Sequence, residues 1–246
     1  SFGSELGLTP NFGKWKQKGI FFNNFYANGF QTRHAEIAAY CSVMPNYGES
    51  VFSHYNSNHF LCLPEILKRK GYSTSWINGA DAAYDNQLTM FPKIGFQKII
   101  DRFDFPSDTE TLGWGFSDEA LFEKWIKFLD QEKEPFFSSA LTTTNHHPFD
   151  VPEKFQRFEN RSVQNKYYEA VNYVDSVLNQ FLIEVSKSKW FENTLIFVTS
   201  DTSNYQNPQK PFSNFEDFVK TRSKIPLLII GGNIKQPYQE KRYFSQ

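Results

Sequence analysis

Short apolar runs alternate with helical patterns along the chain. Five runs predict strands, because each is rich in apolar or β-branched residues and is bounded by turn residues. They are residues 19–27 (GIFFNNFYA), 72–79 (YSTSWING), 135–143 (PFFSSALTT), 195–198 (LIFV) and 225–232 (IPLLIIGG). Strands this continuously apolar are buried on both faces, which favours a mostly parallel sheet between two layers of helices.

Helical patterns fill the intervals between these strands. Residues 63–71 (LPEILKRKG) predict a short helix with a proline in its first turn and Gly71 as its stop. Residues 117–131 begin with a serine suited to capping and two acids suited to a helix start. From 170 to 185, apolar side chains recur at helical spacing. We therefore expect one α/β domain that spans residues 1–246.

Composition is that of an ordinary globular protein with an aromatic interior. The 246 residues are 39% hydrophobic and 22% charged, and 27 of them are phenylalanine, so we expect a Phe-rich core. The formal net charge of −1 gives no electrostatic footprint for nucleic acid. No apolar run approaches the roughly 20 residues that span a bilayer. The chain starts at Ser1 without a methionine and stops at Gln246 soon after an apolar strand, so we expect a piece of a longer protein.

The two cysteines, Cys41 and Cys62, do not form a CxxC pair. This spacing disfavours a zinc knuckle. Two alternatives remain open for them, free buried thiols or one disulfide.

Polar side chains follow several predicted strands at the point where each leaves the sheet. Ligands of open α/β sheets bind beyond the carboxyl ends of the strands, so these positions are candidates for a functional site. They are Thr32, Asn78, Asp81, Asp85, His146 and Asp201. We expect this hydroxyl, these carboxylates and this imidazole to gather at one edge. Together they supply a nucleophile, a ligand for a hard cation and a proton donor, which are the parts of a phosphoryl or sulfuryl transfer site.

Two of these residues have a structural alternative as well as a chemical one. Thr32 opens the helical pattern TRHAEIAAY, so it is either the N-cap of that helix or a nucleophile at a helix start that favours phosphate. A neutral threonine needs a metal or a base beside it to act as a nucleophile. Asp201 either caps a turn or binds a cation. Of the adjacent His146 and His147, we expect at most one to face the site.

Five segments, taken in order, resemble lipoteichoic acid synthase-like phosphoglycerol transferases, which belong to the sulfatase branch of the alkaline phosphatase superfamily. The resemblance covers nearly the whole chain. It implies the alkaline phosphatase/sulfatase-like three-layer α/β/α fold with a mostly parallel central sheet, here truncated at both ends. It also implies that N-terminal membrane helices, the first strand and a C-terminal part lie outside residues 1–246. The segments are residues 8–36, 63–86, 115–125 (GFSDEALFEKW), 142–149 (TTTNHHPF) and 196–201 (IFVTSD).

The resemblance further implies an activity and a place in the cell. Similar proteins take glycerol phosphate from phosphatidylglycerol through a phosphothreonine and pass it to a glycan or polymer acceptor. On this basis Thr32 is the nucleophile, His146 contacts the substrate phosphate and serves as an acid, and Thr32 and Asp201 bind a divalent metal. That metal is Mn²⁺ by resemblance, with Mg²⁺ or Zn²⁺ as alternatives. The expected place is the extracytoplasmic side of a bacterial cytoplasmic membrane, with a membrane phospholipid as donor and no nucleic acid as partner.

The chain departs from the family pattern at the predicted metal and substrate positions. The family has a histidine after its strand-end aspartate, and this chain has Thr202, whose hydroxyl is a weaker ligand for a transition metal. A metal-binding glutamate of the family would fall upstream of Ser1. The family's substrate arginine aligns with Asn86 and Gln87, which implies a different head group or none. The predicted substrate-binding residues are Asn78, Asp85, Asn86, Gln87 and His147.

Two other functions remain open. A hydrolase of the same superfamily would hand the phosphoryl group to water. Sulfate-ester hydrolysis is disfavoured, because residues 31–36 (QTRHAE) lack the C/S-x-P-x-R sequence of sulfatases. A non-catalytic relative would bind glycan or lipid head groups, and Thr202 is its main support.

Overall fold

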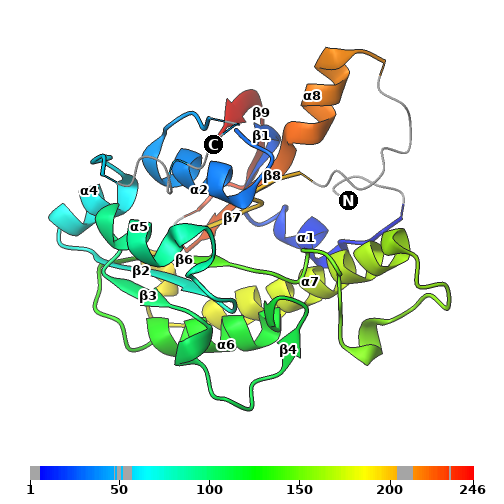
Figure 1. Cartoon of the computed structure of the whole chain (residues 1–246), viewed down its shortest axis with the longest axis horizontal. Helices are drawn as coiled ribbons and strands as arrows, with labels where there is room; N and C mark the ends of the chain where they lie inside the picture. The colour runs from blue at the N-terminus through cyan, green and yellow to red at the C-terminus, as the bar shows by residue number, and fades with distance from the viewer. Residues whose placement is uncertain (1–5, 47, 49–50, 52–56, 204–212, 233) are drawn as a thin grey trace. The chain divides into compact units, whose positions relative to one another are not determined.

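The computed structural model describes residues 6–246 apart from 47, 49–50, 52–56, 204–212 and 233 (Figure 1). The chain divides into two compact units. The first unit comprises residues 1–13 and 64–191, and the second unit comprises residues 14–63 and 192–246. No helix in the described part of the chain is long and apolar enough to cross a membrane.

The first unit contains a three-stranded parallel sheet in the order β3-β2-β6. The central strand β2 (Ser73–Asn78) pairs in parallel with β3 (Lys98–Ile100) on one side and with β6 (Phe136–Leu141) on the other. Both β2 and β6 form where apolar runs predict strands. The parallel arrangement predicted from those runs is therefore confirmed in this sheet.

Helices cover both faces of this sheet. Successive side chains of a strand point to opposite faces. Accordingly, Trp76 packs against Phe91 of α5 (Gln87–Lys93), with ring centroids 4.7 Å apart. Its neighbour Ile77 packs into a cluster with Leu121 of α6. The first unit thus has the three-layer α/β/α arrangement that we predicted.

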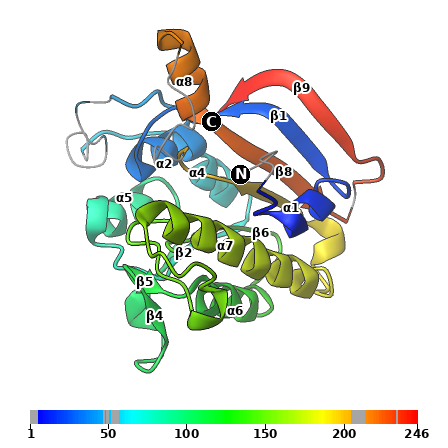
Figure 2. The same cartoon turned by 90° about the vertical axis from the view of Figure 1, so that its right-hand side faces the viewer.

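Two long helices lie side by side in the first unit (Figure 2). The hydroxyl of Ser117 accepts the N–H of Ala120 and caps α6 (Asp118–Leu129), as predicted. The second helix, α7 (Val163–Val185), starts earlier than its apolar pattern, because Ser162 caps it and its first turns are polar. Stacked aromatic rings join the two helices, in keeping with the Phe-rich core expected from composition.

The second unit contains a four-stranded mixed sheet in the order β7-β8-β1-β9. Figure 2 shows β8, β1 and β9 side by side. β8 runs antiparallel to both of its neighbours, and β9 runs parallel to β1. The sheet is therefore mixed where a mostly parallel one was expected. The strands are β1 (Ile20–Tyr26), β7 (Leu195–Thr199), β8 (Lys224–Gly231) and β9 (Tyr238–Ser245).

The edge strands of this sheet differ from the sequence expectation. Leu195 and Phe197 of β7 are 54% and 60% exposed, so the prediction that this run is buried on both faces is wrong. β7 is an edge strand, and the exposed side chains alternate along it, so one of its faces is open to solvent. The opposite edge strand, β9, was not predicted, because its sequence YQEKRYFS carries charged and polar side chains. Backbone pairing with β1, rather than apolar burial, holds β9 in place.

The remaining elements are short. The other helices are α1 (Pro10–Trp15), α2 (Thr32–Cys41), α4 (Leu63–Arg69) and α8 (Phe215–Ser223). A hairpin pairs β4 (Thr111–Leu112) with β5 (Gly115–Phe116), and single 3₁₀ turns occupy Tyr84–Asn86, Arg102–Asp104, Glu153–Phe155 and Phe191–Asn193.

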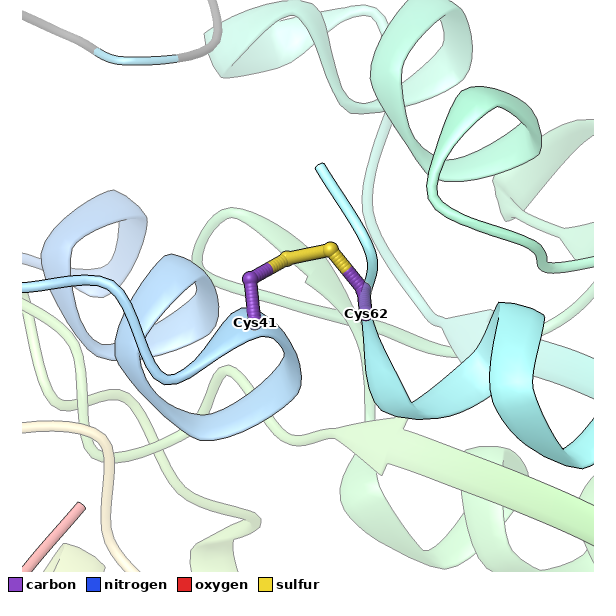
Figure 3. The surroundings of a disulfide bond; sticks show 2 residues. All are labelled: Cys41 and Cys62. Atoms are coloured by element: carbon purple, nitrogen blue, oxygen red, sulfur yellow. A yellow bond between two sulfur atoms is a disulfide. The ribbon is translucent and has the colours of Figure 1, made fainter. Parts of the chain in front are cut away.

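Cys41 and Cys62 form a disulfide (Figure 3). The bond joins the last residue of α2 to the residue that precedes α4. Of the two alternatives left open by the sequence, the disulfide is therefore the one adopted. Closing a loop with a sequence separation of 21 residues stabilises the fold by about 3 kcal/mol, mainly by restricting the unfolded chain.

Candidate active site

Thr32 is the first residue of α2 in the second unit. Gln31, with extended backbone angles (φ −139°, ψ 150°), occupies the N-cap and makes no side-chain capping bond. The N-cap is thus one residue before Thr32, and the alternative that Thr32 caps this helix is wrong. Its hydroxyl turns to another partner, since Oγ1 donates a hydrogen bond of 2.6 Å to Oδ2 of Asp201.

Asp201 follows the end of β7 in the same unit, and its two carboxylate oxygens have different partners. Oδ2 accepts the hydroxyl of Thr32, and Oδ1 accepts the backbone N–H of Thr202 at 2.7 Å. Oδ1 thus contacts the amide of the next residue, and Oδ2 meets the predicted nucleophile. A turn-capping role for Asp201 stays a prediction. Thr32 and Asp201, both predicted as site residues from their positions after strands, therefore lie within hydrogen-bonding distance although they are 169 positions apart.

Thr32 and Asp201 present the ligand chemistry of a hard cation. Hydroxyl and carboxylate oxygens suit Mg²⁺ and Mn²⁺, and the 2.6 Å contact places them close enough to share one ion. Among the residues with described positions, no three His, Cys, Asp or Glu side chains form a metal-binding group. The pair fits part of a divalent-metal site, and such an ion requires further oxygen or nitrogen ligands.

Thr202 reaches Asp201 through its backbone. Besides the N–H bond to Asp201, its carbonyl oxygen accepts the hydroxyl of Ser200 at 2.7 Å. These contacts close a tight turn directly after β7. A metal-ligating role for the Thr202 hydroxyl stays a prediction.

Gln246 connects the loops that carry Thr32 and Asp201, and sequence reasoning missed it. Its Nε2 donates to the carbonyl oxygens of Ser200 and Asp201 at 3.1 and 3.2 Å. Its Oε1 accepts the backbone N–H of Asn28 at 3.2 Å, in the segment between β1 and α2. No sequence signal marks this residue, because the segments that it bridges meet only in the folded chain.

His146 belongs to the first unit and is exposed in the loop after β6. Its ring lies on the indole of Trp114, with centroids 3.9 Å apart. Nδ1 is 2.9 Å from the carbonyl oxygen of His147. A carbonyl can only accept, so Nδ1 carries the proton and Nε2 is the ring atom left for a ligand. The ring of His147 contacts Phe149 instead, so the two adjacent histidines have different neighbours, as expected.

Trp114 stands at the tip of the hairpin between β4 and β5. Gly113 has φ +62°, which suits the first central position of a type II′ turn. Trp114 is 51% exposed and also meets the edge of the Tyr84 ring, with centroids 5.8 Å apart. An exposed Trp in contact with a predicted site histidine is a candidate ligand contact that the sequence analysis missed. The glycines around it in GWGF were the available signal.

A cavity of about 240 Å³ adjoins this tryptophan within the first unit. Its volume exceeds the roughly 30 Å³ share of one water several times over and lies below the 300 Å³ of pockets for drug-sized ligands. The lining residues are Gly79, Arg102, Thr111, Gly113, Trp114, Gly115 and Phe116.

The other predicted substrate residues also lie in the first unit. Asn78 is buried at the end of β2, and its Oδ1 accepts the N–H of Ala80 at 2.6 Å, so its side chain holds a turn. Asp85 and Asn86 both have positive φ, at 52° and 62°. Gln87 is buried at the first position of α5. A substrate role for Asn78, Asp85, Asn86 and Gln87 stays a prediction.

Comparison with known proteins places the chain in a family. The family model for sulfatases matches residues 1–246. The chain belongs to the sulfatase family. A curated relative, lipoteichoic acid synthase 1 of Bacillus subtilis (strain 168), is 26% identical over 240 residues. The match covers 90% of this chain and 38% of the relative, so the chain spans well under half the length of that relative.

Solved structures agree on the fold. A protein of the alkaline phosphatase superfamily from Vibrio parahaemolyticus matches with a TM-score of 0.81 and 29% identity, over 96% of this chain and 57% of that one. The lipoteichoic acid synthase LtaP from Listeria monocytogenes matches with a TM-score of 0.87 and 21% identity, over 97% of this chain and 63% of that one. The predicted superfamily fold and the lipoteichoic acid synthase-like resemblance are confirmed. The superfamily generally uses a divalent metal.

Proposed function

We propose that this chain is the catalytic domain of a metal-dependent phosphoglycerol transferase. It takes glycerol phosphate from a phosphatidylglycerol-type lipid and transfers it to a glycan or polymer hydroxyl. The hydrogen bond from Thr32 to Asp201 is the observation that carries the proposal. It joins a hydroxyl nucleophile to a carboxylate in a chain whose relatives include a lipoteichoic acid synthase.

Thr32 and Asp201 have complementary parts in this reaction. Asp201 accepts the Thr32 proton in a hydrogen bond and holds Oγ1 at the start of α2. A divalent ion held by both side chains would lower the pKa of the hydroxyl and neutralise charge on the transferred phosphoryl group.

Two displacements complete the transfer. In the first, Thr32 Oγ1 releases its proton to water and attacks the lipid phosphorus, the bond from phosphorus to the diacylglycerol oxygen breaks, and that oxygen takes a proton from water. In the second, an acceptor hydroxyl attacks the phosphothreonine, the bond from phosphorus to Thr32 breaks, and Oγ1 regains a proton. Positioning and electrostatic stabilisation supply most of the acceleration in reactions of this kind.

His146 is the proposed phosphate contact. Its Nδ1–H is engaged by the carbonyl oxygen of His147, so contact with a phosphate oxygen would use Nε2. Donation from Nε2 requires a proton on both ring nitrogens, that is, the imidazolium form.

The disulfide supports an extracytoplasmic location. Disulfides such as Cys41–Cys62 persist in oxidising compartments and are rare in the cytosol. We place the domain on the outer side of a bacterial cytoplasmic membrane, where the lipid donor and a cell-envelope acceptor are both within reach.

Phosphatidylglycerol turnover by Thr32 variants tests the proposal in the membrane-inserted protein. Thr32→Ala removes the nucleophile, and turnover should fall by at least 10³-fold, since covalent catalysis has no substitute at this position. Thr32→Ser keeps a hydroxyl and should retain measurable turnover. Mass spectrometry of the quenched wild-type reaction should find a phosphoglycerol adduct on Thr32. Unchanged turnover in Thr32→Ala would remove Thr32 from the mechanism.

A non-catalytic lipid- or glycan-binding role is the second candidate, and Thr202 favours it. Thr202 stands where the family has a metal-binding histidine, and its N–H and carbonyl are used in a turn. If wild type binds glycerol phosphate without turnover and Thr202→His gains turnover, the second candidate is correct for the natural chain.

A further inference from the structure

Asp118 is a buried carboxylate that the proposed mechanism does not use. It is the first residue of α6 in the first unit, and none of its surface is exposed. Charged side chains are almost never fully buried unless a partner compensates them. The carboxylate of Asp118 accepts hydrogen bonds from backbone amides and, in the described part of the chain, has no cation as partner. The segment that carries these amides is therefore the part of the chain that Asp118 holds.

The amides come from the loop that carries His146. Oδ1 of Asp118 accepts the N–H of Thr143 at 3.2 Å and the N–H of Thr144 at 3.4 Å. The carbonyl oxygen of Thr143 in turn accepts the N–H of His146 at 2.9 Å. A chain of hydrogen bonds therefore runs from the buried acid to the backbone of the predicted phosphate contact.

The other end of the loop is also fixed. The carbonyl oxygen of His146 accepts the N–H of Phe149 at 2.9 Å, and Phe149 is buried. Thr144 is buried as well, whereas His146 between these two anchors is exposed. The loop is thus held at both ends with the imidazole presented outward, and Asp118 is the anchor on the β6 side.

We propose that Asp118 is a positioning residue for His146. Its carboxylate binds the backbone of Thr143 and Thr144 and so fixes the loop from which the His146 ring reaches a phosphate. The assignment of phosphate contact to His146 rests on the proposed function, whereas the holding of the loop by Asp118 does not.

The surroundings of Asp118 show that this anchor is costly to maintain. Burial raises its pKa to about 6, although the amides of Thr143 and Thr144 favour the charged form. The phenol of Tyr173 on α7 lies within electrostatic reach of Asp118. Burial, followed by the negative charges of Glu119 and Asp118, raises the pKa of Tyr173, which remains neutral. The interactions that offset the burial of Asp118 are the hydrogen bonds that its Oδ1 accepts from Thr143 and Thr144.

Amide hydrogen exchange tests the holding role directly. Asp118→Asn keeps an oxygen at the Oδ1 position and removes the charge, whereas Asp118→Leu keeps the bulk and removes both acceptors. Glu119→Gln is the matched control, because the Glu119 side chain pairs with Lys154 at 3.5 Å. In Asp118→Leu the amides of Thr143, Thr144 and His146 should exchange at least tenfold faster than in wild type. In Asp118→Asn and Glu119→Gln their rates should stay within about twofold.

Unchanged exchange in a folded Asp118→Leu protein would overturn the proposal. Equal acceleration in Asp118→Asn and Asp118→Leu would also overturn it, because the acceptor oxygen would then not be what matters. If Asp118→Leu does not fold, Asp118→Ala removes the same acceptors without added bulk and takes its place.

A second readout separates this inference from the proposed function. Inorganic phosphate is titrated while the Cε1–H resonance of His146 is followed by NMR. Phosphate should shift the resonance in wild type and in Asp118→Asn, and the apparent affinity should fall at least threefold in Asp118→Leu. If wild type shows no shift while exchange still depends on Asp118, the phosphate role of His146 fails and the positioning of its loop stands. If wild type shifts and Asp118→Leu responds equally, Asp118 does not position His146.

Discussion

The side-chain amide of Gln246 donates a hydrogen bond to the backbone carbonyl of Asp201 at 3.2 Å. The carbonyl oxygen of the same side chain accepts the N–H of Asn28, just upstream of Thr32. One side chain thus sets the spacing between the loop of the proposed nucleophile and the loop of the acid that accepts its hydrogen bond. Both loops and Gln246 belong to the second unit.

Replacing Gln246 should loosen this pair of loops. Gln246→Ala leaves the carbonyl oxygens of Ser200 and Asp201 without their donor, and we expect a loss of about 1–2 kcal/mol in the free energy of unfolding. Gln246→Glu should cost more, since a carboxylate oxygen would face two carbonyl oxygens. Urea unfolding measures both. Gln239→Ala, at an exposed position of β9, the strand that Gln246 follows, is the control and should change stability by less than about 0.5 kcal/mol. Equal effects at both positions would contradict a specific role for Gln246.

Asp201 should set the metal requirement of the proposed reaction. Chelation should stop phosphatidylglycerol turnover, and added Mn²⁺ should restore it. In Asp201→Asn, one charged ligand becomes neutral, so the Mn²⁺ concentration for half-maximal turnover should rise more than tenfold. Asp81→Asn is the matched control, because Oδ1 of Asp81 holds the N–H of Ala83 in a turn, as an asparagine can. A Mn²⁺ requirement that is identical in Asp201→Asn and wild type would exclude Asp201 as a ligand.

Asp118 should make stability fall as pH rises through mildly acidic values. Its pKa is raised from 3.8 to about 6 by burial, so the folded state binds the proton more tightly than the unfolded state. This contribution is fully present below pH 3.8 and is lost as pH rises through 6, at a total of about 3 kcal/mol. Urea unfolding from pH 4 to pH 7 should show this decline in wild type. In Asp118→Asn, which has no proton to release, the decline should be absent.

The disulfide should contribute about 3 kcal/mol to the free energy of unfolding. The chain has two cysteines, so Cys41→Ala combined with Cys62→Ala removes every thiol, and this double variant should unfold at lower urea concentration. Dithiothreitol should lower the stability of wild type by a similar amount and leave the double variant unchanged. If dithiothreitol has no effect on folded wild type, measured after complete reduction is verified by mass, the bond does not stabilise the domain.

The sequence predicts the five strands that carry apolar runs and misses β9 and the two- and three-residue strands β3, β4 and β5. The apolar runs at residues 19–27 and 225–232 predict β1 and β8, because burial of apolar side chains favours strand formation there. β9 carries charged and polar side chains on an edge, so its only requirement is a backbone partner, which no local pattern encodes. The exposure of Leu195 and Phe197 in β7 follows from position in the sheet, which apolar content alone does not reveal.

The candidate site divides in the same way. Asp201 and Thr32 could be predicted together, because both follow strands and the carboxyl ends of strands share an edge. Gln246 could not, since its bond to Asn28 spans 218 residues and involves backbone atoms that every residue type provides. The sequence context of Asp118 fits a first-turn acid of a helix, which gives no signal of its burial. The amides that donate hydrogen bonds to the Asp118 carboxylate come from a loop 25 residues further along the chain.

The side chain of Trp114 lies outside the packed core, on the turn between β4 and β5. The indole sits on a two-residue turn with half of its surface exposed, beside His146 and Tyr84. Exchange of that one ring would alter the surface next to the imidazole while the strands and helices behind it keep their packing. The chemistry of the surface beside His146 is therefore set by a turn residue rather than by a residue of the packed core.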